Sequence, residues 1–345
     1  MIKRYTKVFL IFFLISITVP VTGQLNCSAT LERAEGLFDQ GIIEEIPQIL
    51  EACMKSGFNP QEKMRAQKLM VLTYLFDNDI DNAERVMLDF LRTNPEYTAK
   101  PTDPVEFTAL LSGFRTIPVI SAGFFIGGNL SLPGILEQYG PYNPNADPAA
   151  YMFKPANFQL GASLDIHFGQ IFELNLESFY IRNSFTYSNL QYGFAQINIE
   201  ETHQRFKFPV SFSIILGRSR LSPYLRFGGS YGVLLSASSN YKREFVNTGS
   251  AFYSPLETYN VDITDRRKDH SISVTGGAGL RVKIPRGNVF FDIRYFYSLT
   301  DLVITENRWE NELIYSYFHA DSDFMLDYFA FSVGLRYTFY KPEKR

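Results

Sequence analysis

Four histidines and the acids near them are the side chains whose types best suit catalysis or metal binding: His167, His203, His270 and His319. Asp165 and His167 stand two residues apart, so they share one face of an extended strand, and we interpret them as an ion pair. His319 lies near Asp321 and Asp323. Neither a Gly-x-Ser-x-Gly nucleophile motif nor a His-Glu-x-x-His metal motif occurs. The sequence therefore predicts no enzyme, and no catalytic, metal or cofactor-binding residues.

Polar residues or glycine, some of the polar ones charged, alternate with apolar residues in several stretches, such as 159–168, 269–284 and 322–340. A period of two is that of a β-strand with one polar and one apolar face. The polar face collects seven cations and four anions: Asp165, Glu173, Glu177, Arg205, Lys207, Arg226, Arg281, Lys283, Asp292, Arg294 and Arg336. Because confined charges need partners, we predict an ion-paired network that plugs the lumen of a closed sheet. A narrow anion-selective pore is the alternative.

The alternation predicts eight antiparallel strands, at about 119–131, 157–168, 171–187, 196–216, 222–238, 269–284, 288–304 and 322–340. Short turns at 169–170, 217–220 and 285–288 alternate with long connections at 132–156, 188–195, 239–268 and 305–321. Short turns on one side and long loops on the other are typical of an outer-membrane barrel. A soluble sandwich is the alternative, but a closed barrel leaves no sheet edge to protect.

Composition agrees with this prediction. Phe, Tyr and Trp make up 16% of the 345 residues, and the net charge is −3. This composition excludes a disordered chain, and the absence of a basic surplus argues against a nucleic-acid binder. Rings near strand ends are expected to form lipid-facing girdles: Tyr180, Phe185, Tyr187, Tyr224, Phe227, Tyr295, Tyr297, Tyr337, Phe339 and Tyr340.

The N-terminus predicts export. Lys3, Arg4 and Lys7 precede an apolar run, and small residues follow at 21–23, so residues 1–23 are expected to be a signal peptide, with a signal anchor as the alternative. The chain has two cysteines, Cys27 and Cys53. In an oxidising compartment such a pair predicts one disulfide, and two free buried thiols are the alternative.

Between residues 28 and 114 the apolar period becomes three to four, which predicts helices. Ser28 and Asp103 are expected to cap two of them. Leu37-Phe38-Asp39-Gln40 recurs as Leu75-Phe76-Asp77-Asn78, 38 residues later. This repeat resembles a tetratricopeptide unit, and helical repeats usually bind peptides or proteins. A helical domain without a ligand of its own is the alternative.

The complete pattern resembles the PorT-like family of eight-stranded outer-membrane barrels, some members of which work with a secretion system. Gly334, Tyr337 and Phe339 in the last strand resemble the signal that the barrel-assembly machinery reads, although six residues follow Phe339.

We therefore predict an α+β chain of two domains: a small helical-repeat domain followed by an eight-stranded antiparallel transmembrane β-barrel. The expected parts are a signal peptide (1–23), a periplasmic helical domain (24–115), the barrel (116–341) and a short tail (342–345). The expected function is non-enzymatic, with residues 28–114 docking a periplasmic or membrane protein in secretion or envelope assembly. Expected partners also include outer-membrane lipid and the assembly machinery, but no nucleic acid or cofactor. A surface ligand-binding or lipid-acting barrel, or a narrow pore, is the alternative.

Overall fold

The computed structural model describes residues 26–139, 150–153, 157–191, 193–217, 219–246, 254–306, 308–309 and 312–345. The expected signal peptide lies outside these residues. The chain divides into two compact units, one of Met1–Thr116 with Pro342–Arg345 and one of Ile117–Lys341. We call them the helical unit and the barrel unit. The last four residues, expected to be a separate tail, belong to the helical unit, where Lys344 pairs with Glu84 at 2.5 Å.

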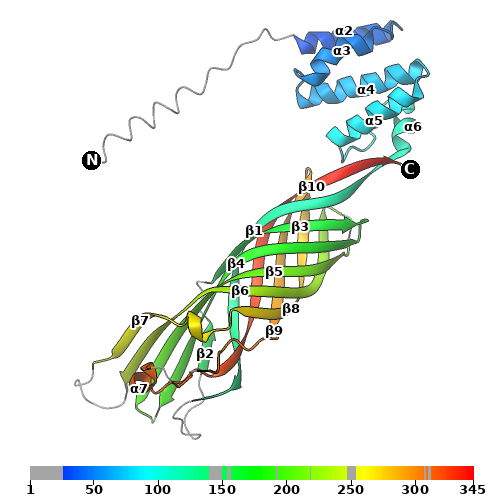
Figure 1. Ribbon diagram of the computed structural model, residues 1–345. Helices are drawn as coiled ribbons and strands as arrows, with labels where there is room; N and C mark the ends of the chain where they lie inside the picture. Colours follow the sequence, from blue (N-terminus) through cyan, green and yellow to red (C-terminus); the bar gives the residue numbers. More distant parts are fainter. Residues whose placement is uncertain are drawn as a thin grey trace, which may run out of the picture. The chain divides into compact units, whose positions relative to one another are not determined.

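The described part of the helical unit has five helices: α2 (Cys27–Asp39), α3 (Ile46–Lys55), α4 (Pro60–Phe76), α5 (Ile80–Thr93) and α6 (Val105–Ser112) (Figure 1). Consecutive helices pack as pairs, α2 with α3 and α4 with α5. Each pair buries the apolar stripe that its sequence predicts, and Leu31, Ile46 and Phe90 are almost completely buried. No helix in the described part of the chain is both long and apolar enough to cross a membrane.

Two helix caps differ from the prediction. Asn26, not Ser28, caps α2, because its side chain accepts a hydrogen bond from the first turn at 3.3 Å. Pro104 stands at the N-cap of α6, without a side-chain cap. Asp103 instead accepts a hydrogen bond from Lys68 of α4 at 2.6 Å. Hydrogen bonds from Lys100, Lys68 and Tyr97 outweigh burial and lower the pKa of Asp103.

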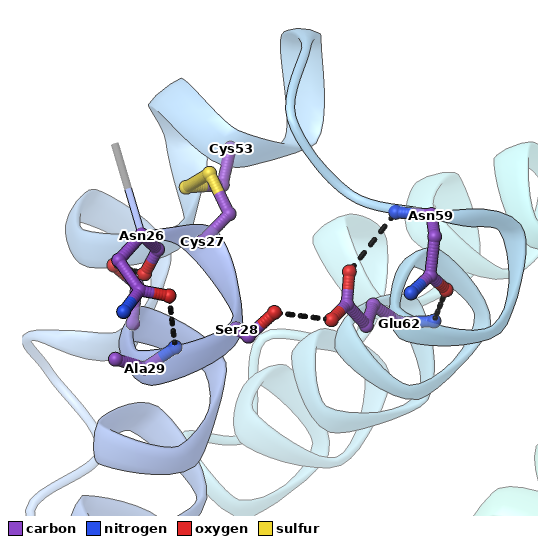
Figure 2. Close-up of a disulfide and its surroundings, with 8 residues drawn as sticks. Asn26, Cys27, Ser28, Ala29, Cys53, Asn59 and Glu62 are labelled. Carbon is purple, nitrogen blue, oxygen red and sulfur yellow. Dashed lines mark hydrogen bonds between the residues drawn. A yellow bond between two sulfur atoms is a disulfide. The ribbon is translucent and has the colours of Figure 1, made fainter. Parts of the chain in front are cut away.

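A disulfide joins Cys27 of α2 to Cys53 of α3, across 26 residues of chain (Figure 2). Beside it, Ser28 donates to Glu62 of α4 at 2.5 Å, and Glu62 accepts from the backbone of Asn59 at 3.0 Å. The start of α2 is therefore held by a covalent bond to one helix and by a hydrogen bond to another.

Eight long strands close into an antiparallel barrel, as predicted: β1 (Phe114–Glu137), β3 (Phe158–Phe168), β4 (Phe172–Gln191), β5 (Ala195–Ile215), β6 (Leu221–Phe245), β8 (His270–Ile284), β9 (Gly287–Ser298) and β10 (Asp323–Lys344). Each long strand pairs with the next, β10 pairs with β1, and the short turns join the strands at one end. We call this end proximal and the opposite end distal.

The strands extend further at the distal end than the sequence predicted. β4 and β5 remain paired up to Gln191 and Ala195, so the long loop expected at 188–195 is a hairpin. β9, in contrast, ends at Ser298 rather than at 304. Since about 9–11 residues cross a bilayer, β4, β5 and β6, with 20, 21 and 25 residues, project beyond it.

Two short strands widen this projection. β2 (Ala150–Phe153) pairs with β4, and β7 (Leu256–Asp262) pairs with β6. We call β2, β7 and the distal parts of β4, β5 and β6 (183–203 and 236–245) the distal sheet. A 3-10 turn (η1, Thr264–Arg266) and a short helix (α7, Leu313–Tyr317) complete the distal end.

The polarity of the barrel wall reverses along β5. Between Phe206 and Phe212 the outward residues are apolar and 40–51% exposed, whereas the inward residues are polar or proline. Beyond Glu201 the inward residues are apolar, as at Ile197 and Ile199, and the outward ones are polar. A β-bulge between Gln204 and Arg205 marks the change. This reversal is expected where lipid surrounds one part of the wall and water surrounds the distal sheet, because a sheet in water needs an apolar core.

The predicted aromatic girdle is therefore only partly correct. Phe227, Tyr297, Tyr337 and Phe339 face outward and are 46–54% exposed. Phe185, Tyr187 and Tyr224 are buried inside, so the prediction was wrong for these three. Phe185 and Tyr187 lie beyond the reversal, where rings belong to the core of the distal sheet.

Candidate functional site

Glu177 is the centre of the charged lumen. Its two carboxylate oxygens accept hydrogen bonds from Arg226 and Arg294, each at 2.5 Å. Asp292 lies 3.6 Å from Arg226 and 3.4 Å from Arg294. All four side chains are almost completely buried. Because each charge has a partner of opposite sign, the group is electrically balanced.

Two further pairs lie nearer the proximal end. Arg336 lies 2.8 Å from Asp165, and Arg281 forms a bidentate ion pair with Glu173. His167 pairs with Glu173 at 2.9 Å, so the expected ion pair between His167 and Asp165 was wrong. The four carboxylates of the proximal lumen are thus matched by four arginines, and the closed plug stays a prediction.

The structure does not bring three of the predicted network residues into this group. Lys283 is exposed at the proximal end of β8. Arg205 and Lys207 are buried, but they lie on the distal side of the ion pairs. Arg205 donates to the backbone oxygen of Lys268 at 3.3 Å, and Lys207 donates to Ser271 at 3.1 Å. The sequence pattern identified the face of these residues but could not identify their partners.

A layer of aromatic rings separates the ion pairs from Arg205 and Lys207. It consists of Phe125, Phe179, Phe290, Phe296 and Tyr328, each 2% exposed or less. Phe125 and Phe179 meet edge to face, with ring centroids 5.8 Å apart. An eight-stranded barrel is just wide enough for side chains to fill, and these rings fill it.

One chain of hydrogen bonds resembles a hydrolase triad in geometry. Ser121 Oγ lies 2.6 Å from His167 Nε2, and His167 Nδ1 lies 2.9 Å from Glu173. A triad needs a serine that a substrate can reach. Ser121 is fully buried and also bonds to Thr338 at 2.8 Å. Arg281 forms an ion pair with the Glu173 carboxylate, so these hydrogen-bonded side chains belong to the buried network of the proximal lumen.

A second buried cluster lies in the distal end, and the sequence analysis missed it. Arg267 donates to Glu201 at 2.6 and 2.9 Å and to Asp321 at 2.9 Å. His203 lies 2.5 Å from Glu201, and the ring of His319 lies tilted against that of Tyr187, with ring centroids 4.8 Å apart. Burial lowers the pKa of both histidines, whereas Arg267 outweighs burial and lowers the pKa of Asp321. In the sequence, His203 stands alone and His319 lies only near Asp321 and Asp323, because residues 201, 267 and 321 are far apart along the chain.

The three residues of the expected assembly signal have visible structural roles. A side chain at Gly334 would lie 2.5 Å from the ring of Phe290, so the glycine leaves room for the aromatic layer. Tyr337 and Phe339 face outward on β10. Recognition by the assembly machinery stays a prediction.

The two copies of the repeat in the helical unit both end a helix, but their registers differ. Gly41 and Asn78 adopt left-handed conformations after α2 and α4, and each forms the same hydrogen-bonded turn. These turns are 37 residues apart, one fewer than the sequence match. Phe38 is consequently half-buried while Phe76 is 59% exposed, and their rings meet at 5.5 Å.

The comparison with protein families decides the class of the barrel unit. Residues 121–303, just over half of the chain, match the family described as "Outer membrane protein beta-barrel domain". The chain belongs to this family. The barrel is therefore an outer-membrane barrel, and its apolar outer face contacts lipid. No curated protein matches the sequence significantly.

Solved structures show similarity at the level of fold. Neisserial surface protein A is 11% identical, with a TM-score of 0.30, over 64% of this chain and 97% of that chain. OprG from Pseudomonas aeruginosa is 14% identical, with a TM-score of 0.32, over 66% of this chain and 96% of that chain. The outer membrane protease OmpT from Escherichia coli is 10% identical, with a TM-score of 0.26, over 64% and 97%. Identities and scores this low carry no argument about function.

Proposed function

We propose that the barrel anchors the chain in the outer membrane and that the helical unit, on the periplasmic side, docks a protein partner in secretion or envelope assembly. The chain enters β1 and leaves β10 at the proximal end, where the short turns lie. In bacterial outer-membrane barrels the short turns are periplasmic. This topology supports a periplasmic helical unit, which can then contact periplasmic or membrane proteins.

An exposed apolar surface on the helical unit carries the proposal. The large apolar side chains exposed in its described part are Ile42, Phe76, Ile80 and Val105. Ile42 follows α2, Phe76 ends α4 and Ile80 begins α5, and the turns after α2 and α4 are at the same end of the unit (Figure 1). We call Ile42, Phe76 and Ile80 the turn patch. Grouped exposed apolar side chains, unlike scattered ones, mark an interaction surface.

The charge around the turn patch indicates the chemistry of the partner. Residues 34–54 and 69–84 contain nine acidic residues and no lysine or arginine. Asp39, Glu44, Glu45, Asp77 and Asp81 among them are exposed. Complementary charge speeds association and selects partners. The expected partner segment therefore carries bulky apolar side chains flanked by lysine or arginine.

Photocrosslinking in intact envelopes tests this function. A photoreactive phenylalanine analogue replaces Phe76 or, as the matched exposed control, Val105 in the full-length protein. We expect position 76 to crosslink one protein through a cationic segment, at a yield at least fivefold above position 105. Asp39→Lys with Asp77→Lys should reduce this yield, whereas Glu32→Lys should not. Crosslinking to no protein, or equal yields at both positions, would contradict the proposal.

The distal sheet favours a second candidate, a surface ligand-binding barrel. Its outward face presents short polar side chains on adjacent strands, including Ser188, Asn198 and Asn240. Tyr259 of β7 is 62% exposed and bonds to Glu257 on the same face as Lys242. If ligand binding were the main role, deleting β7 would impair envelope integrity more than deleting the helical unit.

A further inference from the structure

Lys207 is a buried cation that forms no ion pair with a carboxylate in the described part of the lumen. The four carboxylates of the proximal lumen pair with four arginines, as described above. In the distal cluster, Glu201 and Asp321 share Arg267, and the carboxylates that act on Arg205 are Glu201 and Asp269. Lys207 is 5% exposed, and among the described residues no carboxylate lies within 4.0 Å of its ammonium. A buried charge without a counter-charge is costly.

Unpartnered hydroxyl groups occupy the sheet rows that follow that of Lys207. Its row of the sheet continues through Gly232 to Ser271, whose hydroxyl accepts from the ammonium at 3.1 Å. Ser230 and Ser273 pair in the next row. The ring of Tyr328 lies 5.9 Å from the ammonium nitrogen. Among the described residues, the buried hydroxyls without a hydrogen-bond partner are those of Ser163, Ser211, Ser230, Ser273, Thr275 and Tyr328, and Ser230 and Ser273 lie in the sheet row next to that of Lys207.

These groups share one chemical property, since each can donate a hydrogen bond. Buried polar groups are nearly always hydrogen-bonded, so a cluster of exceptions indicates a ligand or an ion. A ligand for this place must accept hydrogen bonds and carry a negative charge. A water molecule accepts but also donates, and it leaves the ammonium uncompensated.

We propose that the lumen holds a small monovalent anion of the size of chloride beside Lys207, on the distal side of the aromatic layer. The anion accepts from the Lys207 ammonium and from the neighbouring Ser and Tyr hydroxyls, and it restores neutrality. The aromatic layer blocks its passage toward the proximal end, so this is a binding site and not a conduction path. The site is independent of the docking function.

Unfolding of the full-length protein in lipid vesicles, in sodium chloride against sodium gluconate at equal ionic strength, tests the proposal. Gluconate is too bulky for the site. Because a ligand that binds only the folded state stabilises it by mass action, the unfolding equilibrium constant should fall about tenfold when chloride reaches ten times its Kd. Coincident curves in the two salts would overturn the proposal.

Two variants locate the effect. Lys207→Met should abolish the chloride dependence, whereas Lys242→Met, at an exposed lysine paired with Glu244, should retain it. Tyr328→Phe keeps the ring and removes one donor, so chloride binding should weaken severalfold; this variant serves if Lys207→Met does not fold. An unchanged chloride dependence in Lys207→Met or, failing that variant, in Tyr328→Phe would place the anion elsewhere and overturn the assignment.

Discussion

Glu177→Gln is the most informative single change in the lumen. It removes the charge that two arginines share, each at 2.5 Å from the carboxylate, and leaves Arg226 and Arg294 with Asp292 alone, at 3.6 and 3.4 Å. Breaking a buried ion pair costs about 3–5 kcal/mol, because the remaining charge is uncompensated. The glutamine NH₂ also faces guanidinium groups, to which it cannot bond.

Urea unfolding of the folded barrel in lipid vesicles measures this loss. The free energy of unfolding should fall by about 3–5 kcal/mol, roughly a hundredfold to several thousandfold in the equilibrium constant. The matched control is Glu257→Gln, which breaks a partly exposed pair with Lys242 at 3.4 Å. Exposed pairs contribute about 0–1 kcal/mol. A loss at Glu177 as small as the loss at Glu257 would refute the filled, low-dielectric lumen and favour a water-filled pore.

Four further predictions follow from the same structure. Purified protein in planar bilayers should show no conductance steps, because the aromatic layer closes the lumen; steady steps would contradict this. Cys53→Ser should destabilise the helical unit by about 3.5 kcal/mol in urea, from the loop-entropy model for a closed loop of this length; a loss below about 1 kcal/mol contradicts the cross-link's role. A fluorophosphonate probe should leave Ser121 unlabelled, and labelling would show that a substrate can reach it. The distal end should open to protease as the pH falls below about 6.5. The pKa values of His203 and Asp321 are lowered on folding, so the folded state binds fewer protons and loses stability in acid; equal cleavage at pH 7 and pH 5 contradicts it.

The sequence predicted the barrel well because lipid imposes a strict rule on each strand. Phe206, Phe208 and Phe212 face outward, and the alternating residues Lys207 and Ser211 face inward. This period of two depends only on neighbouring residues, so it is visible in one sequence. The eight strands and the short proximal turns were recognised in this way.

The distal end could not be predicted by the same rule. In the distal sheet, beyond the β-bulge, apolar residues face inward and polar residues face outward. The same alternation in the sequence therefore corresponds to the opposite orientation of the two faces. Phe185 and Tyr187, which were expected in the lipid-facing girdle, are consequently buried in the core of the distal sheet. The alternation also gives the face of a residue but not its partner across the lumen. Arg267, which comes from a connecting segment, therefore appeared in no predicted network.

The helical caps show a third limit of sequence reasoning. Ser28 and Asp103 are of residue types that commonly cap helices. In the structure Ser28 instead donates a hydrogen bond to Glu62, and Asp103 accepts one from Lys68. The offset of the repeat, 38 in sequence and 37 in the turns, likewise depends on which residue adopts the left-handed conformation. Propensity locates such a terminus to within a residue or two.

The central claim is that the barrel presents the helical unit to the periplasm, where it docks a partner. Single cysteines introduced at exposed Gln61 of α4 and at exposed Tyr259 of β7 test it in intact cells with a membrane-impermeant maleimide. Cys27 and Cys53 are joined to each other and do not react. We predict that Tyr259→Cys is labelled in intact cells and that Gln61→Cys is labelled only after the outer membrane is permeabilised. Labelling of Gln61→Cys in intact cells would place the helical unit outside and contradict the account.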